Sequence, residues 1–179
     1  MFDLETFRGW TLFLDRDGVI NERIPGDYVK RMEEFKFVHG AREAIARFSE
    51  IFKYILVVTN QQGIGKGIMD ELDLDILHAY MVDGIEKSNG RIDKVYFCPG
   101  LAKDKPECRK PQIGMALQAK ADFPDIDFTQ SLMIGDSLSD IQFGHNAGME
   151  AFFVHHLGEI PDELPSGTPI YTSLADIVF

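Results

Sequence analysis

Apolar runs of strand length that alternate with helical segments are the feature that most constrains how this chain folds. Such runs occur at residues 11–14, 54–58, 94–97, 131–134 and 151–154. The segments between them repeat apolar residues at helical spacing. Strands that alternate with helices are typical of a parallel sheet covered by helices on both faces. The sequence therefore predicts an α/β fold of three layers around a central parallel sheet.

The expected helices lie between these strands and at the end of the chain. They are Ala41–Phe48, Glu71–Lys87 after an N-cap at Asp70, Pro111 to about Phe123, Leu138–Asn146, and a short Ser173–Val178 capped by Thr172. The core-facing stripe of the second helix is expected to be Leu72, Ile76, Leu77, Tyr80, Met81 and Ile85. Neither a repeat nor a low-complexity linker interrupts the pattern, which predicts a single domain over residues 1–179.

Two carboxylates stand where the first apolar run ends. Asp15 and Asp17 follow this run and precede Gly18. Taken alone, the stretch fits a surface turn equally well, because Asp and Gly are common in turns. Neighbouring carboxylates repel each other unless a cation or a shared proton offsets their charge. In open α/β sheets the ligand binds beyond the carboxyl ends of the strands, so the meaning of this pair depends on the residues at the ends of the other strands.

The second run is followed by groups that suit a phosphate. Thr59 offers a hydroxyl, and Asn60 and Gln61 offer amides. The next residues, 63–67, are rich in glycine but match neither GxxxxGK[ST] nor GxGxxG. A flexible loop is therefore expected there.

Charged residues follow the third and fourth runs. Arg109 and Lys110 form a cationic pair just before a predicted helix, which suits an anion. Asp136 follows the fourth run after Gly135, and Asp140 lies one helical turn later, where it is placed to support the site. Together these strand ends predict phosphoryl transfer, in which Asp15 attacks phosphorus and Mg²⁺ sits between Asp15 and Asp136.

Composition restricts the expected partners and compartment. The 179 residues are 45% hydrophobic and 26% charged, which is ordinary for a soluble globular protein. The net charge of −11 disfavours nucleic acid and leaves a small phosphorylated metabolite as the expected partner. The sequence has neither the run of ~20 apolar residues that crosses a membrane nor a signal peptide. We therefore expect cytoplasmic residence without a membrane partner, with Cys98 and Cys108 reduced.

Four segments, in order, resemble the motifs of the haloacid dehalogenase (HAD) superfamily of phosphohydrolases. They are Asp15–Val19, Thr59–Asn60, Lys110–Pro111 and Gly135–Asp140, and the resemblance spans roughly residues 10–155. It implies a Rossmann-like fold and a phosphatase that works through an aspartyl-phosphate intermediate. Because no insertion between the motifs is long enough, a separate cap domain is not expected.

The resemblance also implies a role for each site residue. The catalytic set is the nucleophile Asp15, the general acid and base Asp17, and the phosphoryl-holding residues Thr59 and Lys110. The Mg²⁺ ligands are Asp15, the carbonyl of Asp17, and Asp136, supported by Asp140. The residues expected to contact the substrate are Asn60, Gln61, Lys110 and Arg109, the last at a second phosphate or the sugar.

Within the superfamily, the chain is similar to the histidinol-phosphatase-like branch and most of all to its heptose bisphosphate phosphatases. The similarity lies in Asp15–Asn21, Gly26–Val29, Thr59–Gly67, Asp93–Pro99 and Cys108–Pro111. It implies D-glycero-D-manno-heptose 1,7-bisphosphate as the substrate and a place in carbohydrate metabolism.

The chain departs from this branch in a loop that commonly binds zinc through the pattern C-x-H…C-x-C. Gly100 stands in place of the histidine and Pro106 in place of a cysteine, so Cys98 and Cys108 remain. Structural zinc needs four ligands, nearly always Cys and His, so zinc is not expected. The loop has the length typical of the histidinol enzymes, and a disulfide is the other possibility for its cysteines.

Three other functions stay open at this point. A histidinol-phosphate phosphatase would keep the chemistry and change the substrate. A polynucleotide 3′-phosphatase has a similar segment at 59–64 but conflicts with the acidic composition. A phosphate-sensing receiver domain, which is not an enzyme, would use Asp, Thr and Lys in another order. The anomer of the substrate and the oligomeric state are not indicated.

Overall fold

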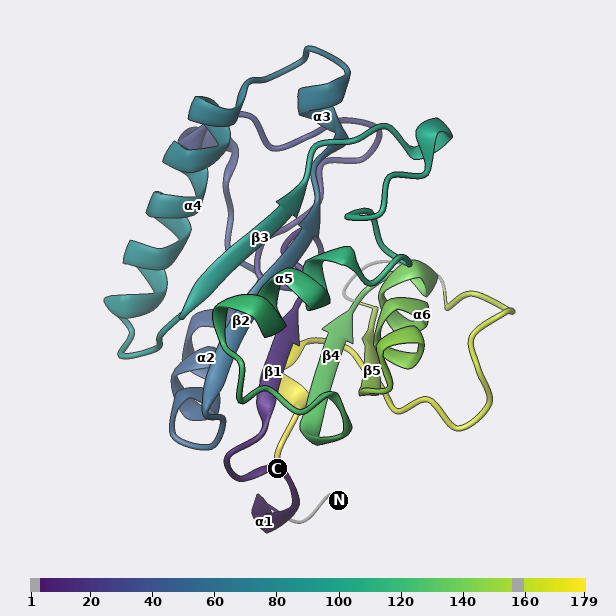
Figure 1. Ribbon diagram of the computed structural model, residues 1–179. Helices are drawn as coiled ribbons and strands as arrows, with labels where there is room; N and C mark the ends of the chain where they lie inside the picture. The colour runs from purple at the N-terminus through teal and green to yellow at the C-terminus, as the bar shows by residue number, and fades with distance from the viewer. Residues whose placement is uncertain (1–3, 156–159) are drawn as a thin grey trace.

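The computed structural model describes residues 4–155 and 160–179. Within them, six strands form one parallel sheet in the order β3-β2-β1-β4-β5-β6 (Figure 1). They are β1 (Thr11–Leu14), β2 (Tyr54–Asn60), β3 (Lys94–Cys98), β4 (Ser131–Gly135), β5 (Glu150–Val154) and β6 (Ile170–Tyr171). The predicted α/β fold with a central parallel sheet is confirmed.

Helices cover both faces of this sheet (Figure 1). The α-helices of the described residues are α1 (Leu4–Phe7), α2 (Ala41–Ser49), α3 (Gln62–Gly65), α4 (Glu71–Glu86), α5 (Gly114–Asp122) and α6 (Leu138–Ala147), and the faces are covered by α2, α4, α5 and α6. Buried side chains of α2 and α4 belong to the same core cluster as Leu12 and Leu14, and those of α5 and α6 share a second cluster with Phe13. Successive strand residues point to opposite faces, so the sheet is the middle of three layers. Over residues 4–155 and 160–179 these layers leave no separate cap domain, and no helix there is both long and apolar enough to cross a bilayer.

The strand order brings the ends of three strands together. Leu14 of β1 pairs with Val57 of β2 on one side and with Ile134 of β4 on the other. Strands β2 and β3 are added on one side of β1, and β4, β5 and β6 are added on its other side. Ligands bind at such a switch point in open α/β sheets, so the fold places the residues after β1, β2 and β4 at one edge.

The buried side of α4 differs from the predicted stripe. Its N-cap is Asp70 as predicted, and the Asp70 carboxylate accepts a hydrogen bond from the backbone N–H of Asp73 at 2.8 Å. The buried residues are Leu74, Leu77, His78, Met81 and Ile85. The predicted core residues Leu72, Ile76 and Tyr80 are exposed. Apolar residues occur on most sides of this helix, so their spacing alone did not identify the side that packs.

Two other helix predictions need correction. The helix expected from Pro111 begins at Gly114, because residues 109–112 form a turn closed by a bond from Gln112 N–H to the Arg109 carbonyl. The C-terminal segment forms only a 3₁₀ turn, Leu174–Asp176. Its cap is the hydroxyl of Ser173, which accepts from Ala175 N–H, and not Thr172.

The glycine-rich segment after β2 is ordered as a helical turn and is not the predicted flexible loop. It forms α3 (Gln62–Gly65). A Cβ on Gly65 would lie 2.6 Å from the carbonyl oxygen of Pro99, so the glycine permits close packing against the loop after β3. Strand β6 was not predicted, because two residues are too short to show a period of two.

Cys98 and Cys108 are joined by a disulfide, which corrects the expectation that both are reduced. Their Cα atoms are 5.3 Å apart, within the range that a disulfide spans. Strand β3 carries Cys98 to the edge of the sheet, and the loop returns beside it through a 3₁₀ turn at Ala102–Asp104. The sequence showed the loop length but not that its ends meet.

Candidate active site

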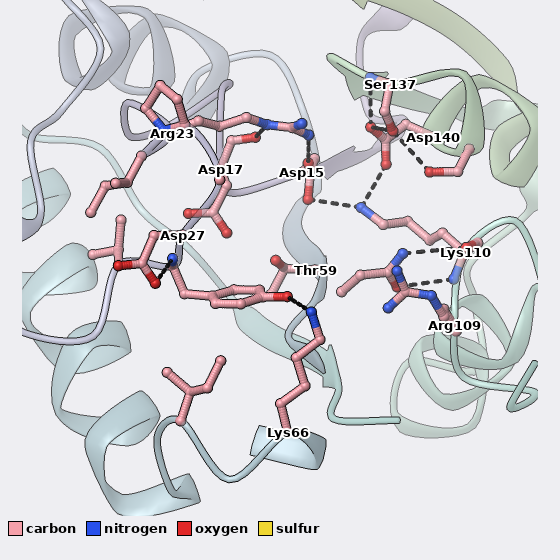
Figure 2. A pocket seen from close by; sticks show the side chains of 18 residues that line it. Asp15, Asp17, Arg23, Asp27, Thr59, Lys66, Arg109, Lys110, Ser137 and Asp140 are labelled. Carbon is pink, nitrogen blue, oxygen red and sulfur yellow. Dashed lines mark hydrogen bonds and ion pairs between the residues drawn. The ribbon is translucent and has the colours of Figure 1, made fainter. Parts of the chain in front are cut away.

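A pocket of about 640 Å³ opens at the carboxyl edge of the sheet (Figure 2). The predicted site residues on its wall are Asp15, Asp17, Thr59, Asn60, Arg109, Lys110 and Asp140. They come from the ends of β1 and β2, the loop before α5 and the start of α6. Small-molecule sites have volumes of this size. Segments far apart in the sequence therefore meet as the strand-end argument predicted.

Lys110 is a buried cation held between two carboxylates. Its Nζ lies 2.8 Å from Oδ1 of Asp15 and 2.6 Å from Oδ1 of Asp140, and it donates to the Val58 carbonyl at 2.7 Å. Burial opposes its charge, but Asp140 and Asp15 outweigh burial and raise the pKa of Lys110. Burial and Asp140 raise the pKa of Asp15 to about 6, although Lys110 acts against them. The amine thus stays charged beside the predicted nucleophile.

Asp15 and Asp136 form an acidic pair that suits a hard cation. One oxygen each from Asp15, Asp136 and Asp140 lie within 4.8 Å of one another. Burial and the nearby Asp15 raise the pKa of Asp136 to about 8, so ionising both carboxylates calls for a neighbouring positive charge. Carboxylate and carbonyl oxygens are the ligands that Mg²⁺ prefers. The donor set, with the Asp17 carbonyl included, fits the predicted metal.

Gly18 allows Asp136 to approach the segment after β1. Its φ is +88°, and a Cβ at this position would lie 1.8 Å from Oδ2 of Asp136. A side chain there would force the carboxylate away from Asp15. The glycine of the Asp-x-Asp-Gly stretch is therefore required by packing and not only by the turn.

Asp140 braces the site from α6. Its Oδ2 accepts from the backbone N–H of Ser137 at 3.0 Å and from the Ser137 hydroxyl at 2.6 Å, which closes a capping box. Its other oxygen pairs with Lys110. Oδ2 is held by the capping box and Oδ1 pairs with the charge of Lys110, so its contacts fit the predicted supporting role.

The carboxylate of Asp17 is held by three side chains. Nη2 of Arg16 donates to both of its oxygens at 2.9 and 3.0 Å, Asn21 Nδ2 donates to Oδ1 at 2.9 Å, and Gln61 Nε2 donates to Oδ2 at 2.8 Å. Burial opposes ionisation, but the charge of Arg16 and the hydrogen bonds from Asn21, Arg16 and Gln61 together outweigh it and lower the pKa of Asp17. Asp17 is therefore fixed beside Asp15 by a network under the pocket.

The three polar residues predicted after β2 take different positions. Thr59 and Asn60 lie on the pocket wall. The Asn60 amide donates to the Lys110 carbonyl at 3.3 Å and accepts from the Lys110 N–H at 3.0 Å, so it ties the two segments together. Gln61 is buried below the wall, where Nε2 also donates to the Thr59 hydroxyl at 2.9 Å. We assign Gln61 to holding Asp17 in place of the predicted contact with substrate.

Arg109 presents a donor without a partner. It lies on the pocket wall beside Lys110 (Figure 2). Its Nη1 is buried and has no hydrogen-bond partner in the part of the chain that the structure describes. Burial also lowers the pKa of Arg109. A buried, unpaired guanidinium nitrogen is costly, and an anion in the pocket would satisfy it.

Arg23, Tyr28 and Lys66 are among the residues of the pocket wall to which the sequence analysis gave no role. Arg23 and Tyr28 come from the connection between β1 and α2, and Lys66 follows α3. Lys66 Nζ donates to the hydroxyl of Tyr28 at 2.9 Å. Arg23 Nη2 lies 2.5 Å from Oδ1 of Asp136, which it covers. These residues lie in loops, and nothing in their spacing indicated that the loops fold over the sheet edge.

Comparison with known proteins agrees with this geometry. The HAD-hydrolase-like family matches residues 107–177. The chain is 39% identical over 142 residues to a D-glycero-alpha-D-manno-heptose-1,7-bisphosphate 7-phosphatase of Mycobacterium tuberculosis, covering 79% of this chain and 75% of the relative. It is 46% identical over 136 residues to the enzyme of the same name from Campylobacter jejuni, covering 76% of each.

A solved structure is similar over nearly the whole chain. It is the D,D-heptose 1,7-bisphosphate phosphatase from B. bronchiseptica, complexed with magnesium and phosphate. The TM-score is 0.85 at 30% identity, and the match covers 93% of this chain and 94% of that one.

Proposed function

The chain belongs to the HAD-like family of heptose-1,7-bisphosphate 7-phosphatases, and we propose that it hydrolyses D-glycero-D-manno-heptose 1,7-bisphosphate through a phosphorylated Asp15. The observation that carries the proposal is the position of this carboxylate. One oxygen binds Lys110 at 2.8 Å, on the wall of a pocket that also holds the cations Arg23, Lys66 and Arg109. The same wall carries four carboxylates, Asp15, Asp17, Asp27 and Asp140, against these four cations. Because the whole chain has a net charge of −11, the pocket is less negative than the rest of the chain, which supports an anionic substrate.

The proposed reaction has two steps. In the first, an oxygen of Asp15 attacks phosphorus, and the ester oxygen leaves with a proton from Asp17. In the second, water attacks the acyl phosphate while Asp17 takes up its proton, which releases phosphate and restores Asp15. Covalent catalysis divides one difficult displacement into two easier ones. The first step uses the protonated form of Asp17. The second step uses its anionic form, which Arg16 favours.

Residues of three segments balance the charge of the phosphoryl group. Lys110 and the Thr59 hydroxyl are assigned to its oxygens. When bound, Mg²⁺ would be held by Asp15, the Asp17 carbonyl and Asp136, and it offsets negative charge on the transferring group. We propose no zinc for the loop 98–108, because its two sulfurs are joined to each other.

Arg109 supports a substrate with a second anionic group. Its buried and unpaired Nη1 needs an acceptor, and Arg matches the geometry of a phosphate better than Lys does. Lys66 adds a positive charge to the same wall. A small sugar bisphosphate would meet Lys110 with one phosphate and Arg109 with the other.

The proposal extends to the setting of the enzyme. We expect one domain over residues 1–179 that acts on a carbohydrate metabolite, without nucleic acid or membrane. The acidic composition supports the exclusion of nucleic acid.

A substrate panel tests the proposal. The purified protein with Mg²⁺ is given heptose 1,7-bisphosphate, histidinol phosphate, a heptose monophosphate and a 3′-phosphorylated oligonucleotide, and kcat/KM is measured for each. The bisphosphate should be the best substrate. Asp15→Asn should lower kcat at least about 1000-fold, and Arg109→Ala should raise KM for the bisphosphate roughly tenfold or more.

The control is Lys103→Ala, which removes an exposed cation from the same loop. It should leave both constants unchanged, and Arg109→Ala should leave KM for the monophosphate nearly unchanged. Histidinol phosphate as the best substrate would reject the heptose assignment. Substantial turnover by Asp15→Asn would reject the covalent mechanism.

A further inference from the structure

We propose that Arg23 is a built-in counter-cation of the metal site, which Mg²⁺ must displace from its ligands. The inference rests on the proposed function for the identity of the metal and its ligands. It concerns a residue that the proposed function counts among the cations of the pocket wall but to which it gives no step in the reaction. Arg23 lies in the connection between β1 and α2, on the pocket wall.

The guanidinium faces the atoms assigned to the metal. Its Nη2 lies 2.5 Å from Oδ1 of Asp136 and 4.0 Å from Oδ2 of Asp15, and its Nε donates to the Asp17 carbonyl at 3.1 Å. Figure 2 shows the Arg23 side chain reaching over Asp17 toward Asp15. One planar group therefore engages all three of the assigned ligand residues.

The two cations exclude each other at these distances. Mg²⁺ binds oxygen at about 2.0–2.1 Å in a nearly octahedral shell. A guanidinium nitrogen 2.5 Å from Asp136 Oδ1 fills the space that the ion would need at that oxygen. Two positive charges so close together would also repel each other. Mg²⁺ binding to Asp136 and the Asp17 carbonyl thus requires Arg23 to leave.

Arg23 is suited to leaving. Its side chain is 52% exposed, whereas that of Asp136 is 12% exposed and that of Asp15 is 8% exposed. An exposed guanidinium regains water when it dissociates, so its departure costs little compared with leaving the carboxylates unpaired. Arg23 thus offsets the negative charge of Asp15 and Asp136 and is displaced when Mg²⁺ binds to them.

Calorimetric titration with Mg²⁺ tests the inference without turnover. Wild type, Arg23→Gln and a control, Arg31→Gln, are titrated after removal of metal with a chelator. Arg31 is an exposed residue on the same connection and has the same charge. Removal of a competing cation raises the fraction of molecules that are ready to bind, so Arg23→Gln should lower the Kd for Mg²⁺ roughly tenfold. Arg31→Gln should change it less than about twofold.

Crystal structures separate displacement from a simple field effect. In crystals grown with chelator the Arg23 guanidinium should lie on Asp136, and in crystals with Mg²⁺ it should be away from Asp136 and the Asp17 carbonyl. A guanidinium that stays on Asp136 beside bound Mg²⁺ would overturn the inference, even if the Kd changed. An equal Kd for wild type and Arg23→Gln would overturn it as well.

The outcomes also separate this inference from the proposed function. Tighter Mg²⁺ binding by Arg23→Gln, together with no turnover of the bisphosphate, would support displacement and reject the substrate. Efficient turnover together with an unchanged Kd would support the phosphatase and reject the role of Arg23.

Discussion

Arg16 is the residue whose burial is hardest to explain without the site. Its side chain is fully buried and pairs with Asp17 at 2.9 Å. Behind it, Nε2 of His78 lies 3.4 Å from Nη1 of Arg16. A buried guanidinium is tolerated only when its donors are satisfied. Arg16 and His78 therefore form a layer beneath Asp17 that fixes the orientation of its carboxylate.

The pKa of His78 gives a prediction for stability. Burial and the neighbouring Arg16 lower the pKa of His78 to about 3. Between pH 6.5 and about 3, the unfolded chain binds a proton on His78 that the folded chain does not, so acid favours unfolding. The free energy of unfolding should fall by up to about 1.4 kcal/mol per pH unit in this window from this group alone. His78→Gln, which keeps an acceptor for Arg16, should show a shallower fall.

Urea unfolding at several pH values from 7.5 to 4 measures this difference. His39→Gln is the matched control, because it makes the same substitution at an exposed position. If the free energy of unfolding fell equally with pH in wild type and His78→Gln, His78 would not be the group responsible for the fall.

At the scale of single residues, strand ends were the best guide to the site. Asp15 and Asp136 lie close together because strand ends converge, whereas Lys110 reaches them from the loop before α5 and was predicted from its place before a helix. Arg23 and Lys66 were missed because loop conformation depends on contacts that spacing does not encode. Gln61 was predicted to contact the substrate but donates to Asp17. An amide after a strand can point into the pocket or beneath it, and the sequence does not distinguish the two.

Among the elements, the loop between β3 and α5 carries Arg109, which we propose to bind the second phosphate. Its disulfide closes at Cys108, directly before Arg109 and Lys110. Closing a loop of about ten residues stabilises a protein by about 3 kcal/mol in the chain-entropy model. We expect reduction to lower the free energy of unfolding by about that amount and to raise KM for the bisphosphate.

Thiol titration and unfolding with and without a phosphine reductant check this prediction. No free thiol should be detected in the protein until it is reduced. The double variant Cys98→Ala, Cys108→Ala should be insensitive to the reductant. Two thiols that titrate in protein purified under air would contradict the disulfide.

The elements themselves were predictable to different degrees. The five longer strands were found by their apolar runs, which are continuous in β1 and β4 because both are buried on both faces. The side of α4 that packs was not, because three apolar residues on this helix face solvent. The start of α5 was placed too early, since Pro111 suits a turn as well as a first helical turn.

For the whole molecule, the sequence predicted the layers and the ligand edge but not the strand order. Alternating strands and helices imply a parallel sheet. The position of β1 between β2 and β4 depends instead on how the helices pack on the two faces of the sheet. That position has a thermodynamic consequence. Asp15 and Asp136 extend from the two central strands β1 and β4, so a metal bound to both links the middle of the sheet.

Mg²⁺ should therefore stabilise the entire fold and not only the pocket. A ligand that binds only the folded chain stabilises it by about 2.7 kcal/mol at 100 times its Kd. Thermal unfolding of the chelator-treated protein should show a Tm that rises with Mg²⁺ concentration, with NaCl of equal ionic strength as the control. Asp136→Asn should abolish the rise, because it removes one of the two carboxylate ligands. An equal rise in wild type and Asp136→Asn would place the stabilising metal elsewhere.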